Sequence, residues 1–372
     1  MKNNRTNIRL LLTGGGTGGH LFPAVAAAQE FQRQMPETQV LFVGTRRKVD
    51  TRSLGAYGFQ SENIHCYGLK GKSPLELLKA VAILPVSYLQ ACMIIRRFRP
   101  DLILGVGGYV TGPVIVAGKS MGVPTVIHEQ NSVPGLANRK LGRIVDRVCL
   151  SMPGSGARFP AEKIVYTGNP VRRDILELAA SPPPRRDDKK TLLVLGGSQG
   201  AHAVNRLVAE ALQGLPEAVL RHVRVIHQTG EADAAGIREQ YTEKGIDAVV
   251  QPFFTDMVEV YGQADLLVSR AGATTLSEIA VLGKPAILIP FPFAADNHQE
   301  KNAGHYATGG GALQFRQSEL SGNTLAEHIG RLIRDENTLI AMGKAMKELA
   351  FPDAAAKIVT CCLQVMENRN AL

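Results

Sequence analysis

The stretch LLLTGGGTGGHLFP, from Leu10 to Pro23, decides the fold of this chain. An apolar run ends in five glycines and one threonine between Gly14 and Gly19, and His20 follows where a helix is expected to begin. Glycine lets backbone N–H groups approach a ligand closely, and a helix N-terminus carries about half a positive charge directed at an anion. We therefore predict that this loop holds a diphosphate, with a titratable imidazole beside it.

Two other interpretations of the glycine loop stay open. It could be a tight strand-to-helix turn without a ligand, although such turns rarely need so many successive glycines. It also matches the dinucleotide pattern G-x-G-x-x-G. However, the second expected strand ends at Gly44 without the acidic residue typical of NAD enzymes, and the cations Arg46, Arg47 and Lys48 come soon after. This pattern argues against NAD and leaves an NADP enzyme open.

Length and composition indicate a two-domain α/β protein. At 372 residues the chain is too long for one ordinary core, and 45% hydrophobic residues with 38 glycines are typical of soluble α/β enzymes. The five cysteines show no C-x-x-C spacing, which favours a reducing compartment and argues against a zinc site or disulfides. The segment MKNNRTNIRLLLT leads directly into the first expected strand, so we expect no signal peptide and no export.

The net charge of +9 is distributed unevenly along the chain. Residues 1–168 carry 21 lysines and arginines against 9 aspartates and glutamates, a net charge of +12, whereas the remainder has a net charge of −3. Such asymmetry predicts an anionic partner, either a nucleic acid or an anionic membrane surface.

Residues 75–95, LELLKAVAILPVSYLQACMII, form the most apolar part of the chain. Lys79 and Pro85 interrupt this run, so we expect it to fall short of a membrane-spanning helix. Cations flank it: Lys70 and Lys72 before, and Arg96, Arg97 and Arg99 after. An apolar face surrounded by cations is typical of a helix that lies on an anionic bilayer. A core helix with solvated ends is an equally supported alternative.

Polar residues follow two further expected strands, at residues 101–106 and 123–128. The first strand leads to Tyr109, and the second leads to His128, Glu129, Asn131 and Asn138. Parallel strands place their carboxyl ends at one edge of a sheet, where ligands bind, so we expect these residues near His20. A histidine and Glu129 at that edge could form a general base and its orienting partner.

The opening pattern of strand, glycine loop and helix occurs a second time. Residues 191–195 (TLLVL) run into the loop GGSQGA, in which Ser198 offers a hydroxyl to a phosphate, and a helix follows. The segment TGNPVR, ending at Arg172, is expected to be the domain junction. Two such units predict two similar α/β domains, although a plain turn is an equally supported interpretation of the second loop taken alone.

Two segments of the second half are rich in groups that bind phosphates and sugars. In SRAGATTLSE, Arg270 precedes a helix expected to begin near Ala273, and Glu278 could accept hydrogen bonds from both ribose hydroxyls. The second segment, DNHQEKNA, contains Gln299. Carboxylates and amides suit the hydroxyl groups of a sugar, although isolated polar residues are more often simply exposed. Two amphipathic helices are expected at the C-terminus, at residues 325–334 and 354–367.

Seven motifs occur here in the order and spacing of one known family. They are GGGTGGHLFP, GGYVTGP, HEQN, GNPVR, GGSQGA, SRAGATTLSEI and DNHQEKNA. The chain thereby resembles, along nearly its whole length, the MurG family of bacterial glycosyltransferases, the UDP-N-acetylglucosamine–N-acetylmuramyl-(pentapeptide) pyrophosphoryl-undecaprenol N-acetylglucosamine transferases. The family pattern varies at residues 274–276, and its amide pair is His298-Gln299 here, so the role of His298 is undecided.

The resemblance implies a GT-B fold, in which two Rossmann-like domains with parallel sheets face a central cleft. It implies an acceptor- and membrane-facing domain at residues 1–168, on which a C-terminal helix at 353–372 packs, and a UDP-GlcNAc-binding domain at 169–352. The implied reaction transfers GlcNAc from UDP-GlcNAc to the C4 hydroxyl of the MurNAc of lipid I, giving lipid II with inversion. The implied location is peripheral, at the cytoplasmic face of the bacterial inner membrane, on an anionic surface. No cofactor and no metal are implied.

The resemblance also assigns roles to individual residues. His20 is the candidate general base, and the acceptor region contains Tyr109, His128, Glu129 and Asn138. The residues implied in binding UDP-GlcNAc are Thr17, Gly18, Gly19, Asn131, Arg172, Ser198, Phe254, Arg270, Ala273, Thr274, Thr275, Leu276, Ser277, Glu278 and Gln299. Neither half offers a D-x-D-like carboxylate pair, so charge stabilisation by Arg270 and helix N-termini is expected.

Two other classes of function remain as alternatives. One is a different GT-B enzyme that uses the same donor, or a UDP-sugar epimerase, because donor motifs are shared while acceptor loops diverge. The other is a basic nucleotide-binding protein that acts on nucleic acid. Only 5% of the residues are aromatic and none is tryptophan, so few side chains are available to stack on nucleic-acid bases. We therefore expect no nucleic-acid partner.

Overall fold

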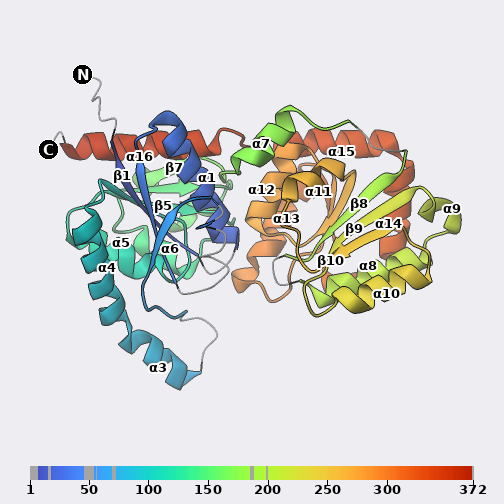
Figure 1. The fold of residues 1–372 in the computed structure, drawn as a ribbon, viewed down its shortest axis with the longest axis horizontal. Coiled ribbons are helices and arrows are strands. Elements are labelled where there is room, and N and C mark those ends of the chain that lie inside the picture. Colours follow the sequence, from blue (N-terminus) through green and yellow to red (C-terminus); the bar gives the residue numbers. More distant parts are fainter. Residues whose placement is uncertain are drawn as a thin grey trace. The chain divides into compact units, whose positions relative to one another are not determined.

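The computed structural model describes residues 7–15, 18–45, 54–55, 57–68, 73–184, 188–197 and 200–370. The chain divides into two compact units, Met1–Arg173 with Phe351–Leu372, and Asp174–Ala350. Each unit contains one parallel sheet with helices around it (Figure 1). The predicted class, two Rossmann-like α/β domains with parallel sheets, is confirmed.

The first sheet has seven strands in the order β3-β2-β1-β4-β5-β6-β7. Their bounds are β1 Arg9–Thr13, β2 Gln39–Gly44, β3 Gln60–Asn63, β4 Leu102–Gly105, β5 Thr125–Glu129, β6 Arg147–Leu150 and β7 Ile164–Tyr166. The strand order reverses between β1 and β4, with Leu10 opposite Leu102. In doubly wound sheets, ligands bind at the carboxyl ends of the strands at this switch point.

Helices cover both faces of the first sheet. The helices of this unit are α1 Gly18–Gln34, α3 Pro74–Ala82, α4 Leu84–Phe98, α5 Thr111–Ser120, α6 Leu136–Leu141 and α16 Ala354–Asn370, of which α3 extends away from the sheet (Figure 1). Side chains alternate along β1, so Leu10 and Leu12 pack against α1 and α16 while Leu11 packs against α4 and α5. This two-sided burial explains the continuous apolar run of the first strand.

The second sheet has six strands in the order β10-β9-β8-β11-β12-β13. Their bounds are β8 Lys190–Leu195, β9 Val223–Gln228, β10 Ala248–Gln251, β11 Leu266–Ser269, β12 Ala286–Leu288 and β13 Ala312–Gln314. The helices from the junction onward are α7 Arg173–Ala180, α8 His202–Gly214, α9 Glu217–Leu220, α10 Ala234–Glu243, α11 Met257–Gln263, α12 Ala273–Leu282, α13 His298–Thr308, α14 Gly322–Arg334 and α15 Glu336–Glu348. Short 3₁₀ helices occur at Ser155–Arg158, Ala161–Lys163, Ala295–Asn297 and Gln317–Glu319.

The same hydrogen bond holds the amino edge of both sheets. In the first, the carboxylate of Asp101, just before β4, accepts from the backbone N–H of Arg9 at 2.9 Å. In the second, the carboxylate of Asp265, just before β11, accepts from the backbone N–H of Thr191 at 2.8 Å. The two units therefore share the local geometry of their first strands as well as the order of their elements.

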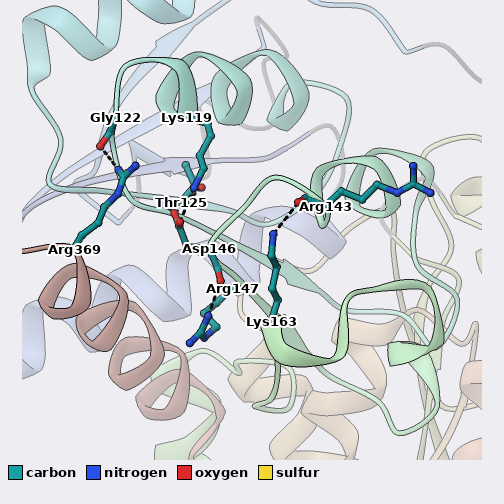
Figure 2. A network of polar contacts seen from close by, with 8 residues as sticks. All are labelled: Lys119, Gly122, Thr125, Arg143, Asp146, Arg147, Lys163 and Arg369. Carbon is teal, nitrogen blue, oxygen red and sulfur yellow. Dashed lines mark hydrogen bonds and ion pairs between the residues drawn. The ribbon is translucent and has the colours of Figure 1, made fainter. Parts of the chain in front are cut away.

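Asp146 connects three elements at the amino edge of the first sheet (Figure 2). Its carboxylate accepts from the Lys119 ammonium at 2.5 Å and from the backbone N–H of Thr125 at 2.8 Å. Burial alone would raise the pKa of Asp146, but these two donors outweigh it and hold the pKa below its ordinary value. In the same region, the guanidinium of Arg369 at the end of α16 donates to the carbonyl of Gly122.

The C-terminal region contains one helix more than the sequence predicted. Three helices, α14, α15 and α16, occupy residues 322–370. Asp335 ends α14, and its carboxylate accepts from the backbone N–H of Thr338 at 3.0 Å, which starts α15. The sequence interpretation missed this cap because no proline or glycine marks the boundary.

The apolar stretch at residues 75–95 forms two helices, α3 and α4, which meet at Ile83. By length and composition, residues 78–98 are long and apolar enough to cross a membrane, with a mean hydropathy of 1.8 over the most apolar window. Length and composition do not by themselves make a spanning helix, so the expectation that this stretch does not cross a membrane stays a prediction. Of that window, 28% is buried, and the buried face of α4 packs against α5.

Candidate active site

The loops after β1 and β4 touch each other at the carboxyl edge of the first sheet. A side chain at Gly14 would come within 2.3 Å of the Val106 side chain, and one at Gly108 within 2.8 Å of the Gly15 carbonyl oxygen. Only glycine therefore fits at these positions. Helix α1 begins at Gly18, and Gly19 beside it is exposed. Thr17 lies outside the described residues.

His20 lies in the first turn of α1 and is half-buried. Its Nδ1 is 3.1 Å from the carbonyl oxygen of Val106. Because a carbonyl only accepts hydrogen bonds, Nδ1 carries the proton of the neutral ring, and the lone pair is on Nε2. A neutral imidazole with a fixed tautomer is suited to act as a general base through Nε2.

His128, on β5, is fully buried. Its Nε2 is 3.1 Å from the Gly168 carbonyl oxygen and 3.0 Å from the Ser151 hydroxyl. Burial lowers the pKa of His128 to about 4, so the ring is neutral at physiological pH. Both ring nitrogens contact protein atoms. In this structure His128 therefore holds the segments at Ser151 and Gly168 in place.

Glu129 closes the loop between β5 and α6. One carboxylate oxygen accepts from the backbone N–H of Asn131 at 3.0 Å, and the other accepts from the Gly135 N–H and the Asn138 amide, each at 2.9 Å. In the described part of the chain, these hydrogen bonds of the Glu129 carboxylate all go to residues 131–138. The predicted pairing of a histidine base with Glu129 was therefore wrong, since the partner of His20 is the Val106 carbonyl.

Tyr109 and Asn138 lie at the same edge of the first sheet. Tyr109 is half-buried, packs against the core beneath α4 and α5, and its carbonyl accepts from the Cys66 thiol at 3.4 Å. Asn138 is buried, and its amide donates to the His128 carbonyl at 3.1 Å as well as to Glu129. Tyr109 is thus partly accessible, whereas Asn138 holds the loop in place.

Arg172 is buried close to the start of α1. Its guanidinium lies over the Phe22 ring, 4.5 Å from the centroid, and donates to the Tyr57 hydroxyl at 3.4 Å. A cation stacked on an aromatic face in a buried position is held firmly. The structure thus brings Arg172 within the first unit to the helix that carries His20.

The second glycine loop joins β8 to α8. Gly200 has φ +76°, and a side chain there would come within 2.2 Å of the Thr229 carbonyl oxygen, so glycine is required. The Gln228 amide donates to the Gly197 carbonyl at 3.2 Å and accepts from the backbone N–H of Phe254 at 3.1 Å. The N–H of Phe254 is therefore occupied by Gln228. Ser198 lies outside the described residues.

Gln299 holds together two loops at the start of α12. Its side-chain oxygen accepts from the backbone N–H groups of Ala271 at 3.2 Å and Phe291 at 3.0 Å. Because both partners are donors, this atom is the oxygen, and the amino group of the amide is directed elsewhere. Gln299 thereby positions the backbone just before Ala273, where the helix begins.

The residues predicted to follow a nucleotide along α12 are mostly buried. Among Ala273, Thr274, Thr275, Leu276, Ser277 and Glu278, only Thr275 is half-exposed. The Ser277 hydroxyl donates to the Ala273 carbonyl within the helix at 2.9 Å. Contact with a ligand at the beginning of α12 would therefore come mainly from backbone N–H groups. The Glu278 carboxylate accepts from the Tyr261 hydroxyl at 3.0 Å.

The guanidinium of Arg270 donates hydrogen bonds to three other groups of the protein. It donates to the carbonyls of Ile289 at 3.0 Å and Pro290 at 3.1 Å, and to the Gln317 amide at 2.7 Å. Burial lowers the pKa of Arg270 to about 10, so the group still carries its charge at neutral pH. Its positive charge can act on a bound anion, while its hydrogen bonds fix the loop after β12.

His298 starts α13, directly after two residues in the left-handed region, Asp296 at φ 53° and Asn297 at φ 54°. Its Nδ1 is 2.8 Å from the Ala295 carbonyl oxygen. This bond places His298 in the turn that presents Gln299.

Sequence reasoning missed two buried glutamines, Gln130 and Gln228, each of which bridges loops at the carboxyl edge of its own sheet. Only their position at or just after a strand end could have indicated them. Within the described part of the chain, no group of three or more His, Cys, Asp and Glu side chains is arranged to hold a metal ion.

The helices α3 and α4 expose several apolar side chains, called here the α3–α4 surface. Its members are Leu78, Val81, Val86, Leu89 and Met93, of which Leu78 and Met93 are 66% and 62% exposed. Lys79, Arg96 and Arg97 are exposed beside them, and Arg97 pairs with Glu62. Lys70 and Lys72 lie outside the described residues.

Comparisons with known proteins agree along the whole chain. Residues 10–150 match the model of the glycosyltransferase family 28 N-terminal domain, and residues 191–358 match that of the family 28 C-terminal domain. A UDP-N-acetylglucosamine–N-acetylmuramyl-(pentapeptide) pyrophosphoryl-undecaprenol N-acetylglucosamine transferase of Desulfotalea psychrophila is 56% identical over 372 residues, 100% of both chains. One of Geobacter sp. strain M21 is 44% identical and covers 98% of both chains.

Solved structures show the same fold. The crystal structure of Acinetobacter baumannii MurG matches with a TM-score of 0.73 at 30% identity, covering 96% of this chain and 99% of that one. A UDP-GlcNAc 2-epimerase from Neisseria meningitidis, bound to UDP-GlcNAc, matches with a TM-score of 0.69 at 13% identity, covering 96% and 100%. At that identity, the second likeness concerns the fold alone.

Proposed function

The chain belongs to the family of UDP-N-acetylglucosamine–N-acetylmuramyl-(pentapeptide) pyrophosphoryl-undecaprenol N-acetylglucosamine transferases, and from this premise we propose its reaction in detail. It is a glycosyltransferase of the GT-B class that moves GlcNAc from UDP-GlcNAc to the C4 hydroxyl of the MurNAc of lipid I, giving lipid II. The observation that carries this proposal is 56% identity over the entire chain.

The acceptor hydroxyl is activated by His20. The lone pair on Nε2 accepts the proton of the C4 hydroxyl while the oxygen attacks the anomeric carbon of GlcNAc. The new C–O bond forms as the bond from that carbon to the diphosphate breaks, and its electron pair leaves with UDP. A single displacement of this kind inverts the anomeric configuration. The support is the Val106 carbonyl, which holds the proton on Nδ1.

The donor is bound largely by the second unit. Backbone N–H groups at the beginning of α12 face the diphosphate, and the Arg270 charge adds to the helix dipole as negative charge develops on the leaving group. Glu278 accepts from the ribose hydroxyls, held by the Tyr261 hydroxyl. The Gln299 amino group reaches the sugar, because its oxygen is occupied by two backbone donors. The roles of Thr17, Gly18, Gly19, Asn131, Arg172, Ser198 and Phe254 toward the donor stay predictions.

The first unit faces the acceptor and the membrane. A lipid-linked substrate must be met at a bilayer, and the α3–α4 surface combines exposed apolar side chains with cations. We assign this surface to peripheral binding at the cytoplasmic face of the inner membrane, attracted by anionic lipids. The core packing of Ala91, Ile94 and Ile95 supports this over a crossing helix, since crossing would pull these side chains out of the first domain.

Transfer of radiolabelled GlcNAc from UDP-GlcNAc to a lipid I analogue tests the reaction. We expect label in the lipid product and a β-linkage to C4, the result of inversion at the α-linked donor. The same protein incubated with UDP-GlcNAc alone serves as the control for epimerisation. Conversion of the free nucleotide sugar to its C2 epimer, without transfer, would show that the protein is an epimerase and not a transferase.

A further inference from the structure

We propose that Gln130 is a positioning residue for His20: its side-chain amide orients the Val106 carbonyl, and that carbonyl holds the imidazole in the tautomer that a general base requires. The inference rests on the proposed function of His20 and deepens it. Gln130 itself does not reach the reacting atoms.

Two acceptors determine the orientation of the Gln130 amide. Its amino group lies 2.6 Å from the Val106 carbonyl oxygen and 3.2 Å from Nδ1 of His128. The Nε2 of His128 faces the Gly168 carbonyl, which only accepts, so Nε2 carries the ring proton and Nδ1 is an acceptor. Both hydrogens of the Gln130 amino group are therefore used. The low pKa of His128 agrees with this arrangement, because the neutral ring keeps its acceptor nitrogen.

The Val106 carbonyl is shared between the two side chains. It accepts from Gln130 and from Nδ1 of His20, which is 3.1 Å away. The backbone on either side of this peptide is also held, because the Val106 N–H donates to the Thr13 carbonyl at 2.9 Å and the Thr111 hydroxyl donates to the Gly107 carbonyl at 2.7 Å. Gln130 adds a hydrogen bond to the Val106 carbonyl itself, the atom that His20 faces.

The remaining atom of Gln130 argues against a purely structural role. Its Oε1 is buried without a hydrogen-bond partner in the described part of the chain, near Gly107. An unpaired buried acceptor costs stability, and an apolar side chain of the same length would avoid that cost. The presence of an amide at this position is therefore explained by the hydrogen bond through which its amino group orients the Val106 carbonyl.

Two substitutions of similar size remove the N–H donors, Gln130→Met and Gln130→Glu. In protein labelled with ¹⁵N-histidine, NMR reports which ring nitrogen of His20 carries the proton. We expect the Nδ1–H form to dominate in the wild type and to lose population in both variants. We also expect kcat to fall about 10- to 100-fold through misplacement of the base, with KM for UDP-GlcNAc unchanged within about twofold.

Ser155→Ala is the matched control, because Ser155 is buried in the same unit and donates to the Met152 carbonyl at 2.7 Å. It removes one buried hydrogen bond and should alter neither the His20 tautomer nor kcat. When the wild type transfers GlcNAc, both changes are required of the Gln130 variants, and either one without the other overturns the inference. Failure of both variants to fold also overturns it, because Gln130 would then act on stability. Absence of transfer by the wild type would instead refute the proposed function, and the NMR comparison would still decide the role of Gln130.

Discussion

His20 and Val106 are 86 residues apart in the chain, yet the imidazole Nδ1 of one lies 3.1 Å from the carbonyl oxygen of the other. This contact joins the first turn of α1 to the residue that follows β4, at the point where the strand order reverses. It turns a histidine at a helix start into a base with a defined tautomer.

Replacement of His20 by alanine should abolish most turnover while donor binding persists. General base catalysis contributes about 10²- to 10⁴-fold, so kcat should fall within that range. UDP binding, followed by calorimetry, should stay within about threefold of the wild type, a difference of well under 1.4 kcal/mol. Turnover close to the wild-type rate would show that another group accepts the proton.

A side chain at Gly107 should displace His20. In Gly107→Ala the new methyl would lie 2.9 Å from the imidazole, and φ is +100°. The control is Gly154→Ala, with φ +81° and open space around the position. Each variant should lose about 1–2 kcal/mol of stability from backbone strain. Only Gly107→Ala should also lose kcat, and equal activity of the two variants would contradict the expected contact.

Loss of the Glu278 carboxylate should weaken donor binding. A hydrogen bond to a charged group is worth about 1.5–3 kcal/mol, so Glu278→Gln should raise the Kd for UDP about 10- to 100-fold. Tyr261→Phe removes only the neighbouring hydroxyl that holds Glu278, so its effect should be smaller. An unchanged Kd for UDP in Glu278→Gln would contradict the proposal that Glu278 binds the ribose hydroxyls.

Acidic substitutions on the α3–α4 surface should reduce binding to anionic vesicles. Leu89→Glu and Met93→Glu place a charge at side chains that are 60% and 62% exposed. Ile340→Glu, on α15 of the second unit and 64% exposed, is the matched control and should bind like the wild type. Charge reversal of Arg96 and Arg97 should reduce the free energy of vesicle binding by about 1 kcal/mol per residue. It should also make vesicle binding less dependent on salt concentration. Protein that resists salt and alkaline washing of membranes would indicate a spanning helix instead.

The stability of the first unit should depend on Asp146 at low pH. The pKa of Asp146 is lowered in the folded protein, so its contribution is present above the unfolded pKa, about 3.9, and is lost as the pH falls through the folded value. Asp146→Asn should lower Tm at neutral pH, and the deficit should shrink as the pH falls below about 4. A deficit that is constant from pH 7 to pH 3 would exclude the ionised carboxylate as its source.

Much of the fold followed from local chemistry in the sequence. Apolar runs that end in glycine, at Leu10–Gly14 and again at 191–196, predicted parallel strands entering helices, because the backbone there must turn tightly without a Cβ. The short polar strand β3 and the boundary between α14 and α15 were not predicted, since neither has an apolar period or a breaker residue.

What the sequence determined by itself was the set of chemical groups: a histidine after a glycine loop, a carboxylate and an arginine beside a helix start, and the family to which they belong. What only the tertiary structure decided was which group each of them faces. Glu129 faces its own loop and His20 faces the Val106 carbonyl, although residue types and spacing alone suggested that a histidine and Glu129 would pair. Hydrogen-bond partners 20 to 90 residues apart depend on strand order and on the exact path of glycine-rich backbone, and neither is encoded in local residue preference.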